Sequence, residues 1–213
     1  MAHTPERPAP RITRLRAAGV MAAGLGLTGP PLGALWAWIA PSAHGVVALT
    51  RSGERVQAYL GSEAENLFVA PVLLLALLGV VAVVAATLAW QWRAHRGPGM
   101  ITGLSAGLIA AAGFAVLVGH RLVLQRYGVI DVDTAPVTPE HRVHYIAEGP
   151  PVFLGHTPLQ IAATLLLPAA AGALVYGLCA TWCTRDYLGG YPPEPERRGQ
   201  RAVTAEAGVP PRR

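Results

Sequence analysis

The chain contains no lysine, and charged residues of every kind are scarce. Its 213 residues carry 17 basic side chains, all of them arginine, and charged residues make up 14% of the sequence. Soluble domains usually carry about 25%. Together with a hydrophobic content of 52%, this deficit favours a membrane protein. The arginines lie at the ends of apolar runs, which is typical of membrane topology and not of nucleic-acid binding.

Cysteine is nearly absent, because the chain has only Cys179 and Cys183. Two cysteines one helical turn apart do not make a disulfide framework. We interpret them as small buried residues on a helix, and not as sites of palmitoylation or redox chemistry.

Ionisable side chains are missing from four long apolar stretches, which argues strongly against a proton-coupled transporter and less strongly against a carrier of hydrophobic substrates. The chain also lacks a phosphate-binding loop, a nucleophile elbow and a dinucleotide-binding fingerprint. We therefore expect a protein that is not an enzyme and has no cofactor. The stretches cover residues 17–41, 67–92, 100–119 and 159–184.

These stretches predict an all-α membrane protein, because about 20 apolar residues in a helix cross a bilayer. We expect a four-transmembrane-helix bundle over residues 15–184, between disordered tails at 1–14 and 185–213. The first span is interpreted as a retained anchor and not a signal peptide, because Trp36 and Trp38 close it like an interfacial aromatic belt. The predicted spans are about 17–40, 66–92, 99–120 and 158–183.

The two segments between spans on one side, 41–65 and 121–157, are predicted to form a small β-rich cap. Residues 45–60 read as strand, turn and strand, with Gly53 in the turn. Residues 141–147 predict a third strand, and its natural partner is this hairpin because both lie on the same side of the membrane.

Arginine is distributed unevenly between the two sides of the predicted bundle. Twelve arginines lie on the side of the two tails, and five lie on the side of the cap. The positive-inside rule therefore predicts cytoplasmic termini, an extracytoplasmic cap and a plasma-membrane location.

Six small residues recur at a spacing of four through the third span. Such a stripe lets a neighbouring backbone approach closely. Four residues turn a helix by about 400°, so the stripe winds around the axis and one straight partner cannot follow all of it. We expect its cytoplasmic half to face the second span and its external half to face the first or fourth. The residues are Gly99, Gly103, Gly107, Ala111, Ala115 and Gly119.

Local signals predict helix starts and bends. Two polar pairs have capping-box spacing at the starts of the second and fourth spans. Prolines within the first and fourth spans predict kinks, which we interpret as packing features and not as hinges. The capping pairs are Ser62 with Glu65 and Thr157 with Gln160, and the kink residues are Pro30, Pro31 and Pro168.

The polar segments contain histidine and aspartate, but not in a metal-binding pattern. Asp131, Asp133, His141 and His144 are weak candidates for a metal site. Because strand side chains alternate, His141 and His144 would point to opposite faces of a strand. We therefore expect no bound metal.

Several segments of the chain resemble a known family. They are the run Pro-Pro-Leu-Gly-Ala-Leu-Trp-Ala-Trp-Ile-Ala-Pro at 30–41, the hairpin, and Arg-Ala-His-Arg-Gly-Pro-Gly at 93–99 before the glycine-rich third span. Together they resemble a family of small four-span membrane proteins from actinobacteria, including mycobacteria, that is catalogued as a domain of unknown function. The resemblance covers about residues 11–190. It implies an actinobacterial inner-membrane location and assigns no catalytic or ligand residue.

The leading hypothesis is a non-enzymatic structural or accessory subunit. It would present the cap to a partner from the envelope or respiratory machinery, or to a second copy. The alternative is a carrier of a small hydrophobic substrate or lipid, with a cavity lined by Thr28, Ser105 or Thr164. An enzyme that uses the external histidines and aspartates is the third hypothesis.

Overall fold

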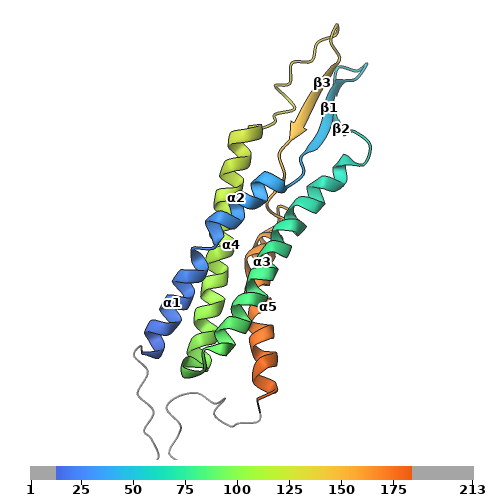
Figure 1. The fold of residues 1–213 in the computed structure, drawn as a ribbon. Coiled ribbons are helices and arrows are strands. Elements are labelled where there is room, and N and C mark those ends of the chain that lie inside the picture. The colour runs from blue at the N-terminus through green and yellow to red at the C-terminus, as the bar shows by residue number, and fades with distance from the viewer. Residues whose placement is uncertain (1–12, 184–213) are drawn as a thin grey trace, which may run out of the picture.

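A computed structural model describes residues 13–183, which form a bundle of long helices with a small sheet at one end (Figure 1). Two one-turn helices, η1 and η2, lie directly before and after α3. The elements in order are α1 (Arg14–Gly26), α2 (Gly29–Ile39), β1 (Ala43–Leu49), β2 (Arg55–Tyr59), η1 (Glu63–Glu65), α3 (Asn66–Gln91), η2 (Arg93–His95), α4 (Pro98–Tyr127), β3 (Val143–Glu148) and α5 (Pro158–Thr181). The predicted tails lie outside the described residues, apart from Thr13 and Arg14.

Four helical segments are long and apolar enough to cross a membrane, as the sequence predicts. α1 and α2 together form the first of them, and α3, α4 and α5 are the others. α4 has 30 residues and extends seven residues beyond the predicted span. Its length of about 45 Å exceeds the hydrocarbon thickness of a bilayer, about 30 Å. It ends at Tyr127, and the following Gly128 has a φ of 72°, which glycine adopts without strain.

The first span is two helices and not one kinked helix. The Thr28 hydroxyl donates to the Leu25 carbonyl oxygen at 2.6 Å and closes the last turn of α1. Pro30 and Pro31 then lie in the first turn of α2, where the missing N–H groups need no helical partner. The chain changes direction between the two helices (Figure 1). Pro168 and Pro71 lie inside continuous helices, in α5 and α3.

α4 is the central helix of the bundle. One side packs against α1 and then α2, and the other packs mainly against α5. The prediction that Gly103 and Gly107 face the second span is wrong. A methyl group built on Gly103 would lie 2.6 Å from the Ala18 carbonyl oxygen, and one on Gly107 would lie 2.9 Å from the Cα of Ala22. Both neighbours belong to α1.

The external half of the stripe contacts α2, the second helix of the first span. The first span is one of the two partners predicted for this half. Gly29 and Gly33 of α2 lie against the backbone of Ala111 and Ala115. The first span therefore follows the winding stripe because it is broken in the middle. Gly99, the first residue of the stripe, has no neighbour within 4 Å of its added methyl group.

The first span carries a matching series of small residues that sequence reasoning missed. Ala18, Ala22 and Gly26 lie four residues apart, and so do Gly29, Gly33 and Ala37 after the break. The two series are offset by three residues at the break, so no single spacing connects them. A search for two short series on either side of Pro30 and Pro31 would have found this contact.

Two further expectations are wrong. Trp36 is fully buried and not interfacial, because its ring lies against Gly119 and its indole N–H donates to the Ala70 carbonyl oxygen at 2.7 Å. Trp38, in contrast, is 76% exposed.

Ser62 and Glu65 form no capping box, because Ser62 has φ −93° and ψ 9° and makes no side-chain cap bond. The Glu65 N–H donates instead to the Ser62 backbone oxygen.

The capping box at the start of α5 is present. The Thr157 hydroxyl accepts from the Gln160 N–H, and the Gln160 side chain accepts from the Thr157 N–H at 3.1 Å. This pair lies where the chain leaves the sheet and enters the bundle.

Candidate functional site at the three-stranded sheet

The sheet joins three strands in the order β2-β1-β3, and both pairs are antiparallel. β1 and β2 form the predicted hairpin, in which Val46 lies opposite Ala58. β3 covers most of the predicted third strand and pairs with β1, with Val46 opposite Tyr145. The prediction that residues 141–147 pair with the hairpin is therefore confirmed for 143–147.

One face of the sheet is covered by the segment between α4 and β3. Val47 is fully buried there, beneath Ala135 and Val137. Leu49, Val132 and Ile146 pack against these residues and complete a small apolar core. We call this the covered face.

The opposite face is apolar and has no such cover among the described residues. Val56 is 47% exposed, Val143 is 52% exposed and Tyr145 is 71% exposed. His44 is the only ionisable group of the three strands on this side other than the tyrosine phenol, because side chains alternate along a strand. We call this the open face; it consists of His44, Val46, Ala48, Val56, Ala58, Val143, Tyr145 and Ala147.

A polar network crosses the covered face close to the bundle. Tyr59 donates its phenolic hydrogen to Glu148 Oε2 at 2.7 Å, and the Gln57 amide donates to the same oxygen at 3.0 Å. β1 lies between these strands, and Gly45 is the β1 residue opposite Tyr59. A methyl group built on Gly45 would lie 2.8 Å from the Ala58 carbonyl oxygen, so this position needs glycine. The network ties both outer strands together across the central one.

Burial, the hydrogen bond to Glu148 and the negative charge of Glu148 together raise the pKa of Tyr59 to about 12, and burial is the largest of these causes. The neutral phenol is therefore favoured in the folded sheet. Its contribution to stability is complete below pH 10.0, the ordinary pKa, and is lost as the pH rises through about 12.

We expect the difference in tyrosinate absorbance between the wild type and Tyr59→Phe to titrate with a midpoint of about 12. Glu148→Gln should lower that midpoint, because it removes the carboxylate charge while keeping an acceptor oxygen. A wild-type midpoint at the ordinary 10.0 would contradict the network.

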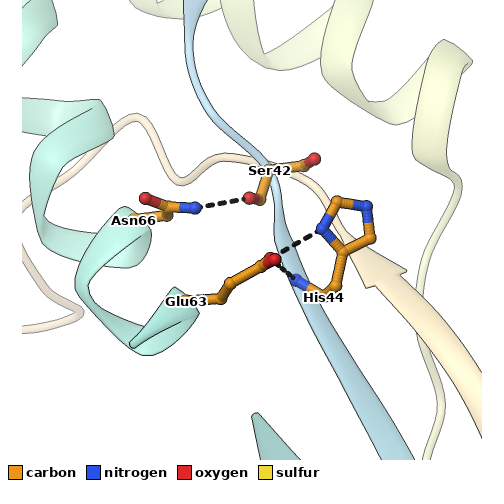
Figure 2. Close-up of polar contacts among 4 residues, drawn as sticks. All are labelled: Ser42, His44, Glu63 and Asn66. Atoms are coloured by element: carbon orange, nitrogen blue, oxygen red, sulfur yellow. Dashed lines mark hydrogen bonds and ion pairs between the residues drawn. The ribbon is translucent and has the colours of Figure 1, made fainter. Parts of the chain in front are cut away.

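A second polar contact fixes the sheet to the start of α3 (Figure 2). Glu63 Oε2 lies 2.6 Å from both the backbone nitrogen and Nδ1 of His44, and the Asn66 amide donates to the Ser42 carbonyl oxygen at 2.9 Å. The Glu63 carboxylate, next to the expected cap residue Ser62, therefore bonds to β1 instead of capping a helix. Nothing in the local spacing indicates this pairing, because the partners are separated along the chain.

The four weak metal candidates are not gathered into one site. Asp131 Oδ1 accepts from the Asp133 N–H at 3.0 Å in a local turn. His141 precedes β3 and donates its N–H to the Thr138 hydroxyl, while His144 lies opposite Val47. Within residues 13–183, no three histidine, cysteine or acidic side chains come close enough to hold a metal ion.

The hydroxyl groups considered for a carrier cavity bond mostly to their own helices. Thr164 is fully buried and donates to the Gln160 carbonyl oxygen at 3.1 Å. The Thr28 hydroxyl is used at the break between α1 and α2, and Ser105 is half-buried in α4. Cys179 and Cys183 are half-buried and are not joined to each other.

Comparison with known proteins gives relatives whose roles are not described. The family described as "Protein of unknown function (DUF2567)" matches residues 25–190. An uncharacterised protein of Mycobacterium tuberculosis (strain H37Rv) is 53% identical over 190 residues, which cover 87% of this chain and 98% of the relative. An uncharacterised protein of Mycobacterium leprae (strain TN) is 53% identical over 167 residues, 78% of this chain and 84% of the relative. No solved structure matches. The expected resemblance to an actinobacterial family is thereby confirmed.

Proposed function

Since the chain belongs to the DUF2567 family of proteins of unknown function, we propose its role from its own geometry. It is a multi-pass protein of the plasma membrane and a non-enzymatic accessory subunit. Its sheet stands outside the membrane as a cap and presents the open face to another protein. The exposed and largely apolar open face is the observation that carries this proposal.

The proposed orientation rests on charge. The loop between α3 and α4 contains Arg93 and Arg96 and lies at the end of the bundle opposite the sheet (Figure 1). The sequence assigns twelve of the 17 arginines to the side of the two tails, and eight of the twelve lie outside the described residues. The positive-inside rule therefore supports cytoplasmic termini and an external sheet.

The orientation can be tested with single cysteines in a variant that lacks Cys179 and Cys183. We expect Ser52→Cys, in the exposed β1–β2 turn, to react with a membrane-impermeant maleimide in intact cells. Ala94→Cys, in the loop of Arg93, should react only after the membrane is permeabilised. The reverse labelling pattern would contradict the proposed orientation.

A partner on the open face is supported by the chemistry of that face. Exposed valines and a tyrosine on one face, with the His44–Glu63 pair as its charged contact, are typical of an interaction surface and costly to leave in water. The opposite face of the same sheet is already covered by the chain's own residues. One face of the sheet therefore packs against the chain itself, and the other face is free to contact a partner protein.

The accessory role predicts site-specific crosslinking. A photo-crosslinking amino acid at Ala58, an exposed open-face position, should give an adduct of one fixed mass in native membranes. The same residue at Thr138, in the segment that covers the other face, should give none. Val56→Asp should abolish the Ala58 adduct, because it places a charge in the apolar contact. An adduct from Thr138 alone, or from neither site, would refute the proposal.

A further inference from the structure

The outer edge of β3 has a row of backbone groups that point away from the sheet. The Leu49 N–H donates to the Arg142 carbonyl oxygen at 2.8 Å, so these two residues form a hydrogen-bonded pair. Every second β3 residue after Arg142 then also exchanges backbone hydrogen bonds with β1. His144, Ile146 and Glu148 therefore face β1 with their N–H and C=O groups. Val143, Tyr145 and Ala147 direct theirs outward, and no backbone hydrogen bond from elsewhere in residues 13–183 reaches them.

This edge has none of the features that protect an exposed strand. Free edges are usually blocked by proline, lysine, a bulge or a covering element. β3 contains no proline, lysine or arginine, and its pairing with β1 runs without a bulge from Val143 to Glu148. Val143 and Tyr145 are also half or more exposed. The strand is therefore ready to accept another strand.

The two ends of β3 carry opposite charges on the covered-face side. Arg142, just before the strand, donates its Nε–H to the Pro139 carbonyl oxygen and pairs with no carboxylate in the described part of the chain. Glu148, at the other end, accepts the hydrogen bonds of Gln57 and Tyr59 on one oxygen, Oε2. A strand lying beside β3 thus meets a positive charge at the Arg142 end, while the Glu148 carboxylate is directed across β1 toward β2.

From these observations we propose that an extended segment of a partner protein adds to β3 as an antiparallel strand. Its backbone pairs with Val143, Tyr145 and Ala147, and its alternate apolar side chains extend the open face. An acidic residue of the segment lies beside Arg142. This inference rests on the proposed function and specifies how its partner binds. Antiparallel pairing is chosen because it is slightly more stable than parallel pairing.

A second copy of the chain does not fit this edge. Two identical β3 strands pair antiparallel only around a two-fold axis perpendicular to the sheet. β3 runs from the free tip of the sheet back toward the helices (Figure 1). The second copy would therefore point its helices away from the first, which two proteins in one membrane cannot do. The occupant is a different protein.

The purified full chain in lipid nanodiscs allows a direct test with synthetic peptides. The probe is the fluorescent peptide Arg-Val-Thr-Val-Thr-Val-Glu, in which the valines face Ala147, Tyr145 and Val143 and the glutamate faces Arg142. We expect saturable binding by fluorescence anisotropy. The same peptide with N-methylated valines should bind at least about tenfold more weakly, because its valine N–H groups no longer reach the β3 carbonyls. Exchanging the arginine and the glutamate should weaken binding several-fold.

A matched pair of variants tests the edge from the protein side. Ala147→Pro removes an outward N–H and leaves the β1–β3 hydrogen bonds intact, so the sheet should fold. It should weaken the peptide about tenfold. Ala147→Ser keeps the N–H and should bind as the wild type does. Hydrogen exchange of the Ile146 amide, which faces β1, confirms that the ladder of each variant is intact.

The outcomes separate this inference from the proposed function. If N-methylated and unmodified peptides bind equally, or if neither binds, strand addition to β3 is overturned. The Ala58 crosslink in membranes then still decides whether the open face has a partner. If the unmodified peptide binds selectively and Ala147→Pro also loses the Ala58 adduct, both proposals stand. An Ala58 adduct that persists in Ala147→Pro overturns the edge contact alone.

Discussion

Replacing Trp36 with alanine is expected to lower the free energy of unfolding by about 3–5 kcal/mol, the cost of deleting a large buried aromatic side chain. Trp36 is fully buried where α2, α3 and α4 meet. α2 otherwise makes few contacts with α3. The hydrogen bond from its indole to the Ala70 carbonyl oxygen, 2.7 Å long, therefore joins these two helices directly. Thermal unfolding in detergent measures the loss.

Two controls separate packing from other effects of the Trp36 substitution. Trp36→Phe keeps much of the ring but loses the hydrogen bond, so it should cost less than alanine, although its smaller ring also leaves some space. Trp38→Ala removes the same type of side chain from a position that is 76% exposed, and its effect should be within about 0.5 kcal/mol. Equal effects of Trp36→Ala and Trp38→Ala would show that Trp36 does not hold the helices together.

Gly103→Leu is expected to be the second strongly destabilising change, because it separates α4 from α1. Even a methyl group at this position would lie 2.6 Å from the Ala18 carbonyl oxygen, and backbone atoms cannot move aside as a side chain can. Overpacking of this kind costs about 1–3 kcal/mol and sometimes more. The melting temperature in detergent should fall accordingly.

Gly99→Leu is the matched control, because it makes the same substitution in the same stripe. Gly99 has nothing within 4 Å of its added methyl group, so the melting temperature should change little. If the two variants lose equal stability, glycine is important for α4 itself and not for its contact with α1. A second substitution tests which atoms of Ala18 clash with the leucine. Ala18→Gly should not restore the stability of Gly103→Leu, because the clash is with backbone atoms.

The secondary structure was largely predictable because its signals are local. The apolar runs and the Gly53 turn located α3, the hairpin and β3 within a few residues. Thr157 with Gln160 has the same capping spacing as Ser62 with Glu65, yet only the first pair forms a capping box. Spacing alone cannot show that the neighbouring Glu63 is held by His44, a contact between different elements.

The strands of the candidate site were predictable from the sequence, but which face of the sheet is exposed was not. Alternation places His44, Val46 and Ala48 on one side and Val47 and Leu49 on the other, but both sides are largely apolar. Which side is covered depends on Ala135 and Val137, more than 80 residues further along the chain. The open face and the free edge of β3 follow only from that placement.

By itself, the sequence determined four long apolar helices, a hairpin with a third strand, and one helix lined with small residues. Each of these depends on composition or on spacing within a short segment. The tertiary structure decided which helix fills the stripe. The short loop after α3 suggested the second span, but the break before Pro30 lets α1 and α2 follow the stripe as it winds around α4. Close backbone packing needs small residues on both partners, and the first span supplies them at Ala18, Ala22, Gly29 and Gly33.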